Sequence, residues 1–448
     1  MNRFNLSLLA FLMGVSLASS QTLDWNGQIS ATGLFSSEDE LPFWFYSNTH
    51  GQFGLESNFS GLAGFTVNYP LNENSGLEGG ATFFYRDNVA DQFQRRDLFL
   101  RFKNNWLKLT LGAERPEEQV QGLSATNKDF LRSGNARPLG GIIAEANNPL
   151  RITESLAFDW GIAHYQLNDD RFVKDVRLHY KRLAAILNFN ENNKLIAQIQ
   201  HYAQWAGTSP VFGELPSDFS AFIDVFFARQ SPEIGINGEI ENAVGNHLGS
   251  YLIDYQFKSG IGDFSIYHEH PFEDGSGTAF KNFPDGVWGV HFKPTETNVF
   301  KGLLYEFITT KDQSASGVSG FDNYFRNNVY RSGWSYEGRI IGMPFILIDN
   351  SIVVDEDSSP IISNREQLHH LGLTGTVHHI DWMLKSTLVS HSGSFVNPFN
   401  PSLDLWHNYL SLAHATKKYG TIKIFTALDS GKSIDTNFGA GVTYSYSF

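Results

Sequence analysis

The stretch NFGAGVTYSYSF, residues 437–448, alternates strictly between apolar and small polar side chains. One parity carries Phe438, Ala440, Val442, Tyr444, Tyr446 and Phe448. A period of two residues is typical of a β-strand with one apolar face. A strand at the end of a chain frays unless something covers it. This strand therefore needs a partner on each edge and a cover for its apolar face.

The same alternation recurs along the whole chain and gives about 18 candidate strands. They include the segments near 25–35, 76–86, 106–112, 195–205, 262–270, 299–310, 380–391 and 436–448. A soluble β-sandwich would alternate in the same way, with its core inside and water outside. Two features favour a membrane barrel: no helical domain interrupts the strands, and many strands carry an aromatic residue near one end. Closure would also give the last strand two partners.

The sequence thus predicts an all-β fold, a transmembrane antiparallel β-barrel with long loops. Short connections at 103–105, 258–262 and 417–420 suit periplasmic turns, whereas longer ones suit the outside or the lumen. The longer ones lie near 113–153, 206–247, 271–285, 311–335 and 391–404.

One segment departs from period two. In SDFSAFIDVFFARQ, which begins at Ser217, the apolar residues recur at helical spacing. We expect a short loop helix with Ser217 or Asp218 as its N-cap, folded back on the barrel mouth or into the lumen. It could serve packing alone, or form a gate or part of a ligand surface.

The N-terminus has the pattern of a secretory signal peptide. Asn2 and Arg3 precede an apolar run at 6–17, and small residues follow at 18–20. The run is shorter than the roughly 20 residues that a membrane helix needs. We expect residues 1–20 to be cleaved and residues 21–448 to form the barrel. The chain has no cysteine, so it can hold neither a bacterial lipid anchor nor a disulfide. The expected location is the outer membrane of a Gram-negative bacterium, with membrane lipid and the barrel assembly machinery as partners.

Several kinds of chemistry lack support in the sequence. The formal charge is −14 without a basic run, which argues against nucleic-acid binding. TALDSGKS, at 426–433, lacks the first glycine of a phosphate-binding loop. His268 and His270 point the same way on a strand, yet no third metal ligand can be identified. We expect no catalytic residue, no metal and no cofactor, so the protein is predicted not to be an enzyme.

Aromatic and polar residues are densest in FDNYFRNNVYRSGWSYEGRIIGMPF, residues 321–345. Flat rings suit the apolar faces of sugars, while Asn, Arg and Glu match hydroxyls and uronate carboxylates. An interfacial girdle that anchors a strand end would have a similar composition.

Within this stretch, Tyr330-Arg331-Ser332-Gly333-Trp334, Tyr336, Gly338-Arg339, Ile341-Gly342 and Pro344 resemble a signature of the Wzi-type capsule assembly proteins. PFWFYSNTHG, at 42–51, and LSATNKDFLRSGNARPL, at 123–139, are similar to further segments of the Bacteroidetes branch of that family. The resemblance implies an outer-membrane barrel lectin of 18 strands that helps to hold exported capsular polysaccharide at the cell surface. The helical plug of the enterobacterial relatives matches no segment here, so no sugar-contacting residue carries over.

The sequence therefore predicts a non-enzymatic barrel that binds capsular or exopolysaccharide and helps to assemble or retain it. We expect four residues at or near the polysaccharide: Tyr324, Arg331, Trp334 and Tyr336. The alternative function is a porin-like or substrate-specific diffusion channel of the outer membrane, which the same strand pattern permits.

Overall fold

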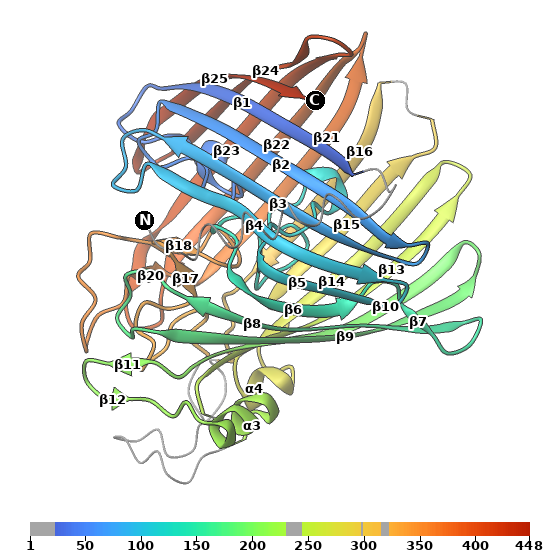
Figure 1. The fold of residues 1–448 in the computed structure, drawn as a ribbon. Coiled ribbons are helices and arrows are strands. Elements are labelled where there is room, and N and C mark those ends of the chain that lie inside the picture. Colours follow the sequence, from blue (N-terminus) through green and yellow to red (C-terminus); the bar gives the residue numbers. More distant parts are fainter. Residues whose placement is uncertain (1–22, 230–243, 297–298, 315–321) are drawn as a thin grey trace, which may run out of the picture.

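The computed structural model describes residues 23–229, 244–296, 299–314 and 322–448. These residues form a closed antiparallel barrel of 18 strands (Figure 1), as the alternation predicts. Among them, no helix is long and apolar enough to cross a membrane. The predicted signal peptide lies outside the described residues.

The strands follow one another around the barrel in sequence order. They are β1 Asp24–Ser36, β2 Phe59–Asn72, β3 Ser75–Arg86, β4 Phe93–Asn104, β5 Leu107–Ala113, β6 Gly140–Ala146, β8 Leu156–Leu167, β9 Val176–Asn190, β10 Asn193–Trp205, β13 Asn246–Ser259, β14 Gly262–Phe272, β15 Gly286–Pro294, β16 Phe300–Thr309, β21 Glu366–Val377, β22 Ile380–Gly393, β23 Pro398–Thr416, β24 Gly420–Gly431 and β25 Ile434–Ser447. The two-residue strand β7, Leu150–Arg151, also pairs with β8 beyond the end of β6 and adds no position to the ring.

The last strand closes the barrel. β25 pairs with β24 on one edge and with β1 on the other, in a register that sets Ser36 opposite Gly439. Phe448 extends the closure, because its N–H and C=O both bond to the backbone of Gly27 at 3.0 and 2.7 Å. The apolar parity faces outward, with Val442 50% and Tyr444 44% exposed. The terminal strand β25 thus has both edges paired and its apolar face toward lipid.

Short turns gather at one end of the barrel and long loops at the other (Figure 1). Membrane barrels have short periplasmic turns and longer extracellular loops, so we assign the long-loop end to the cell exterior.

Three predicted connections were wrong in extent. The one at 113–153 contains β6, whose GGIIAEA segment is short and rich in small residues. The connection after β16 continues from 310 to 365 because the chain folds into the barrel before β21. The one at 391–404 shrinks to 394–397, since β22 and β23 extend as a hairpin that pairs Gly393 with Pro398.

Three outer connections fold inward and fill the outer part of the lumen. We call them the plug, which comprises residues 37–58, 114–139 and the described part of 310–365. The plug holds only short elements: α2 Phe43–Tyr46, the 3₁₀ turn η2 Val120–Gly122, β17 Ser335–Tyr336, β18 Arg339–Ile340, β19 Leu347–Ile348 and β20 Ile361–Ser363. Several of its side chains are fully buried, at 0% exposure: Leu123, Phe130, Tyr324, Trp334, Tyr336 and Phe345.

The plug is fastened to the wall on several sides. The Phe130 N–H donates to Glu269 of β14 at 2.8 Å, and Ser124 Oγ donates to Glu306 of β16 at 2.7 Å. On another side, Phe45 packs edge-on against Phe425 of β24, with ring centroids 4.9 Å apart. A side chain at Gly439 would block this approach, because an added Cβ would lie 2.7 Å from the Phe45 ring. Gly439 therefore makes room for the plug, whereas Gly441 makes room for Phe425 and Leu34 of the wall.

The predicted loop helix is confirmed as α3, Phe219–Phe227, with Asp218 as N-cap accepting from the Ala221 N–H at 2.8 Å. It lies at the mouth, but outside the lumen. Its Phe222 ring packs against His179 of β9 and Trp205 of β10. These two residues lie on the outer face of the strands, whereas Tyr180 and Tyr202 lie on the face toward the plug. The remaining short elements of the outer loops are β11 Thr208–Ser209, β12 Gly213–Glu214 and α4 Gly275–Thr278.

Candidate functional site

The three stretches that carry the family resemblance lie far apart in sequence and meet in the plug. The Trp334 indole N–H donates to the Leu131 carbonyl at 2.7 Å, and Ser133 Oγ donates to the Gly342 carbonyl at 2.7 Å. Arg339 donates to the carbonyl groups of Tyr46 and Phe53. Segments 42–51, 123–139 and 330–344 thus form one packed unit.

Three of the four predicted contact residues are buried in the plug. Tyr324 donates its hydroxyl to Asp285 at 3.1 Å and accepts from the Asn282 amide at 2.6 Å. Tyr336 donates to Asn168 at 2.6 Å, and Trp334 packs edge-on against Tyr202 of β10, with ring centroids 5.3 Å apart. All three have no accessible surface, so their rings cannot stack on a sugar without a rearrangement of the plug.

Arg331 differs from these three because its side chain is partly exposed. It lies close enough to Asp355 for its charge to lower the pKa of that carboxyl, after the larger effect of hydrogen bonds within the loop. Of the predicted residues, Arg331 is the one that a ligand at the mouth could reach.

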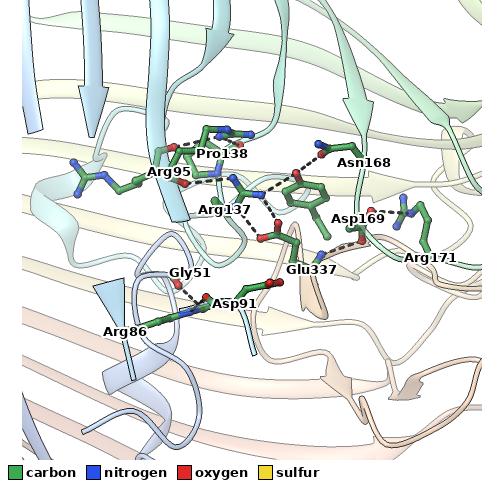
Figure 2. Close-up of polar contacts among 12 residues, drawn as sticks. Gly51, Arg86, Asp91, Arg95, Arg137, Pro138, Asn168, Asp169, Arg171 and Glu337 are labelled. Carbon is green, nitrogen blue, oxygen red and sulfur yellow. Dashed lines mark hydrogen bonds and ion pairs between the residues drawn. The ribbon is translucent and has the colours of Figure 1, made fainter. Parts of the chain in front are cut away.

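An arginine-rich cluster lies around Tyr336 and Glu337 (Figure 2). Arg137 makes a two-pronged ion pair with Glu337 and also donates to the Tyr336 hydroxyl at 3.2 Å. Arg95 and Arg86 donate to backbone carbonyls, those of Pro138 at 2.9 Å and Gly51 at 2.6 Å. These bonds join the plug segments to one another and to β3 and β4.

The cluster concentrates positive charge. Burial lowers the pKa of Arg339 to about 10, and the neighbouring Arg86 charge acts in the same direction. Burial likewise lowers the pKa of Arg171, whose guanidinium pairs with Asp169 at 3.2 Å. Arginine stays charged at neutral pH even so, and Glu337 and Asp169 neutralise part of this charge through their ion pairs.

Beside this cluster is an open cavity of about 690 Å³. We call it the basin. It is lined by loop 168–175, the segment 208–210 and the plug, and its polar lining includes Asp169, Asp170, Arg171, Lys174, Thr208, Ser209, Ser332, Ser335 and Asn350. Its volume is that of a small-molecule site, and hydroxyl, amide and charged groups are the partners that sugar hydroxyls and carboxylates accept. Phe172, Ile352 and Val353 add apolar surface to the wall.

Sequence reasoning missed most of the basin and the arginine cluster. Asp169, Asp170 and Lys174 stand in a connection that carries no motif, and Asn350 lies past the stretch at 321–345. Arg137 did have a signal, since it belongs to the resemblance segment at 123–139.

His268, one of the two histidines that share a strand face in the sequence, makes contacts within the wall. His268 stacks on Trp288, with ring centroids 3.7 Å apart, and its imidazole bonds to the Val287 carbonyl at 3.1 Å. In the part of the chain that the structure describes, no three His, Asp or Glu side chains are placed to hold one ion.

Comparison with solved structures identifies proteins of similar architecture. The chain folds as an outer-membrane β-barrel. It is similar to Wzi of Escherichia coli, with a TM-score of 0.57 and 14% identity over 97% of this chain and 87% of that one. Wzi is described as an outer-membrane protein involved in group 1 capsule assembly and as a carbohydrate-binding β-barrel. It is also similar to OccAB2 of Acinetobacter baumannii, with a TM-score of 0.50 and 11% identity over 95% of this chain and 98% of that one. OccK3 of Pseudomonas aeruginosa gives the same TM-score and identity, over 95% and 96%.

No protein-family model matches the sequence, and no curated protein matches it in a sequence comparison. At these identities the structural similarity shows the fold alone. The assignment of function therefore depends on the plug and the basin.

Proposed function

We propose that this barrel is a non-enzymatic, polysaccharide-binding protein of the Gram-negative outer membrane. It helps to assemble or retain capsular or exopolysaccharide at the cell surface. The observation that carries the proposal is the basin, a polar and charged cavity at the outer end of a plugged barrel. The similarity of the fold to Wzi supports this proposal. The resemblance of the three plug segments to Wzi-type sequences points the same way.

The plug favours binding over the diffusion-channel alternative. A channel needs a continuous polar, water-filled path. Here the outer part of the lumen holds an apolar cluster of fully buried plug residues that includes Phe130, Trp334 and Phe345. Such a cluster suits a platform that presents a surface to the exterior.

In this proposal the four predicted residues divide into two roles. Arg331 joins the basin residues as a contact for acidic sugars, since a guanidinium forms paired N–H bonds with a uronate. Tyr324, Trp334 and Tyr336 support the contact surface from below. Their hydrogen bonds to Asp285, Leu131 and Asn168 hold the loops that shape the mouth.

The test uses the intact barrel in a host that lacks it. The basin variant combines Lys174→Gln with Asn350→Ala, because both side chains line the basin and are exposed. The control variant combines Lys418→Gln with Asn192→Ala, which are the same changes at exposed turn positions on the opposite end. Heat-modifiable mobility measures folded barrel, and cell-bound against released polysaccharide measures function.

We expect the basin variant to fold normally, to bind purified capsular polysaccharide about tenfold more weakly, and to release more of it to the medium. The control variant should retain it like the native protein. Unchanged retention and binding in the basin variant would refute the proposed site. Large, steady single-channel currents from the native protein in planar bilayers would favour the diffusion channel instead.

A further inference from the structure

A second cavity lies on the outer wall of the barrel, away from the plug. It is a groove of about 630 Å³ across β21, β22, β23 and β24, near their extracellular ends. Its lining comprises Lys311, Gln367, His369, Leu388, Val389, Ser390, Asp404, Leu405, Trp406, Ser430, Gly431 and Lys432. We call it the rim groove.

The rim groove faces the membrane side. Leu388 is 54% and Trp406 46% exposed, whereas their strand neighbours Val389 and His407 are buried toward the interior. Toward the midplane the same face becomes apolar, with exposed Leu371, Leu410, Leu412, Ile422 and Ile424. Trp406, whose indole N–H donates to Ser386 Oγ at 2.8 Å, marks the interface between these zones.

Two cations flank the groove. Lys311 follows β16 and Lys432 follows β24, with three strands between them. The strands that carry them are four inter-strand spacings apart, about 19 Å, and both long side chains can close part of this distance. Neither ammonium lies within 4.0 Å of a carboxylate of any described residue, and the one carboxylate that they share in the groove, Asp404, offsets only one of their two charges. Asp404 is the one acidic residue in the lining and accepts from Ser402 Oγ at 3.1 Å.

We propose that the rim groove binds the phosphorylated glycolipid of the outer leaflet, which has the chemistry of lipid A. Its two phosphates pair with Lys311 and Lys432 at the headgroup level. Its sugars lie over Ser390, Trp406 and Ser430, and its acyl chains run down the leucine and isoleucine face below. A phospholipid with one phosphate fits less well because the two cations stand on opposite sides of the groove. The site is separate from the basin and does not depend on polysaccharide binding.

The experiment titrates the purified full-length barrel in detergent with bisphosphorylated lipid A and follows lipid adducts by native mass spectrometry. The probes for comparison are dephosphorylated lipid A and phosphatidylglycerol. The test variant is Lys311→Gln with Lys432→Gln, which removes two charges and leaves polar side chains only one atom shorter. The matched control is Lys417→Gln with Lys418→Gln, two exposed lysines in the turn at the periplasmic end.

We expect lipid A to bind the double variant about 30-fold more weakly, since each lysine near a lipid anion contributes roughly a fivefold effect. Binding to the control should match the native protein, and dephosphorylated lipid A should bind the native barrel as weakly as lipid A binds the double variant. Unchanged lipid A binding in the double variant would overturn the proposal. Equal binding of phosphatidylglycerol and lipid A would also overturn it, because the groove would then be a general anionic-lipid surface.

If the double variant fails to reach the heat-modifiable form, Lys432→Glu alone carries the test. Its side chain is exposed in a two-residue turn between β24 and β25, so the change leaves packing intact. The same lipid titration then gives the same two decisive outcomes.

Discussion

Replacing Trp334 with alanine tests whether the aromatic residues of the plug act through packing. The indole is fully buried, packs against Tyr202 of the wall and donates to the Leu131 carbonyl at 2.7 Å. Truncation of a buried aromatic residue costs about 3–5 kcal/mol, and we expect the upper part of this range because Leu131 also loses its donor.

The loss should fall on the plug and spare the barrel. The wall is held by backbone ladders between neighbouring strands, which Trp334 does not enter. We therefore expect Trp334→Ala to show normal heat-modifiable mobility and faster amide exchange in residues 123–139 and 330–344. We also expect small intermittent currents in planar bilayers from the variant and none from the native protein. Trp106→Ala, at a 61% exposed position in a periplasmic turn, is the control.

Two results would refute this reasoning. Native-like amide exchange in both plug segments would show that Trp334 does not hold them together. Loss of folded barrel with Trp334→Ala alone would show that the wall depends on the plug, contrary to the separate roles assigned here.

Three further predictions follow from individual contacts. Burial raises the pKa of Asp322 from 3.8 to about 7, and the Asp274 charge adds to this effect. The contact between α4 and the plug is therefore fully stable below the ordinary pKa of an aspartate, and it loses stability as pH rises through 7. The loss is roughly 1–2 kcal/mol after allowance for solvent screening. The protection factors of amides in residues 274–285, which correct exchange for its intrinsic base-catalysed rate, should fall from pH 5 to pH 8 in the native protein and stay constant in Asp322→Asn. An equal fall in the variant would contradict the assignment. Deletion of Phe448 together with Tyr446→Asp should reduce the amount of folded barrel in the outer membrane, because it removes two closing hydrogen bonds and places a charge on the outer face. Normal amounts of folded barrel on heat-modifiability gels would contradict the membrane assignment. Gly439→Val should displace α2 at a cost of about 1–3 kcal/mol, since its Cβ would meet Phe45 at 2.7 Å, and unchanged protease resistance of residues 37–58 would count against it.

The wall of the barrel was predictable because its signal is local. In β25 the alternation of residues 437–448 specifies both the strand and its lipid face, and similar patterns gave the other long strands. β6 was missed because seven residues of GGIIAEA carry too little alternation. The extent of the connection at 310–365 was also missed, since its order comes from contacts such as Ser133 to Gly342, which are 209 residues apart.

The site was harder to predict because a plugged barrel places surface-like sequence in a buried setting. Tyr324, Trp334 and Tyr336 stand among Asn, Arg and Ser, a composition that is typical of a wet binding surface. In the structure the same polar neighbours turn inward as well, and they satisfy the backbone groups of a plug that has few regular elements of its own. Arg339, which bonds to the carbonyls of Tyr46 and Phe53, is an example. Aromatic residues next to arginine in a long barrel loop therefore predict a folded plug as readily as a sugar contact. The residues that remain exposed at its outer end, Arg331 and the basin side chains, are the ones that a ligand can reach.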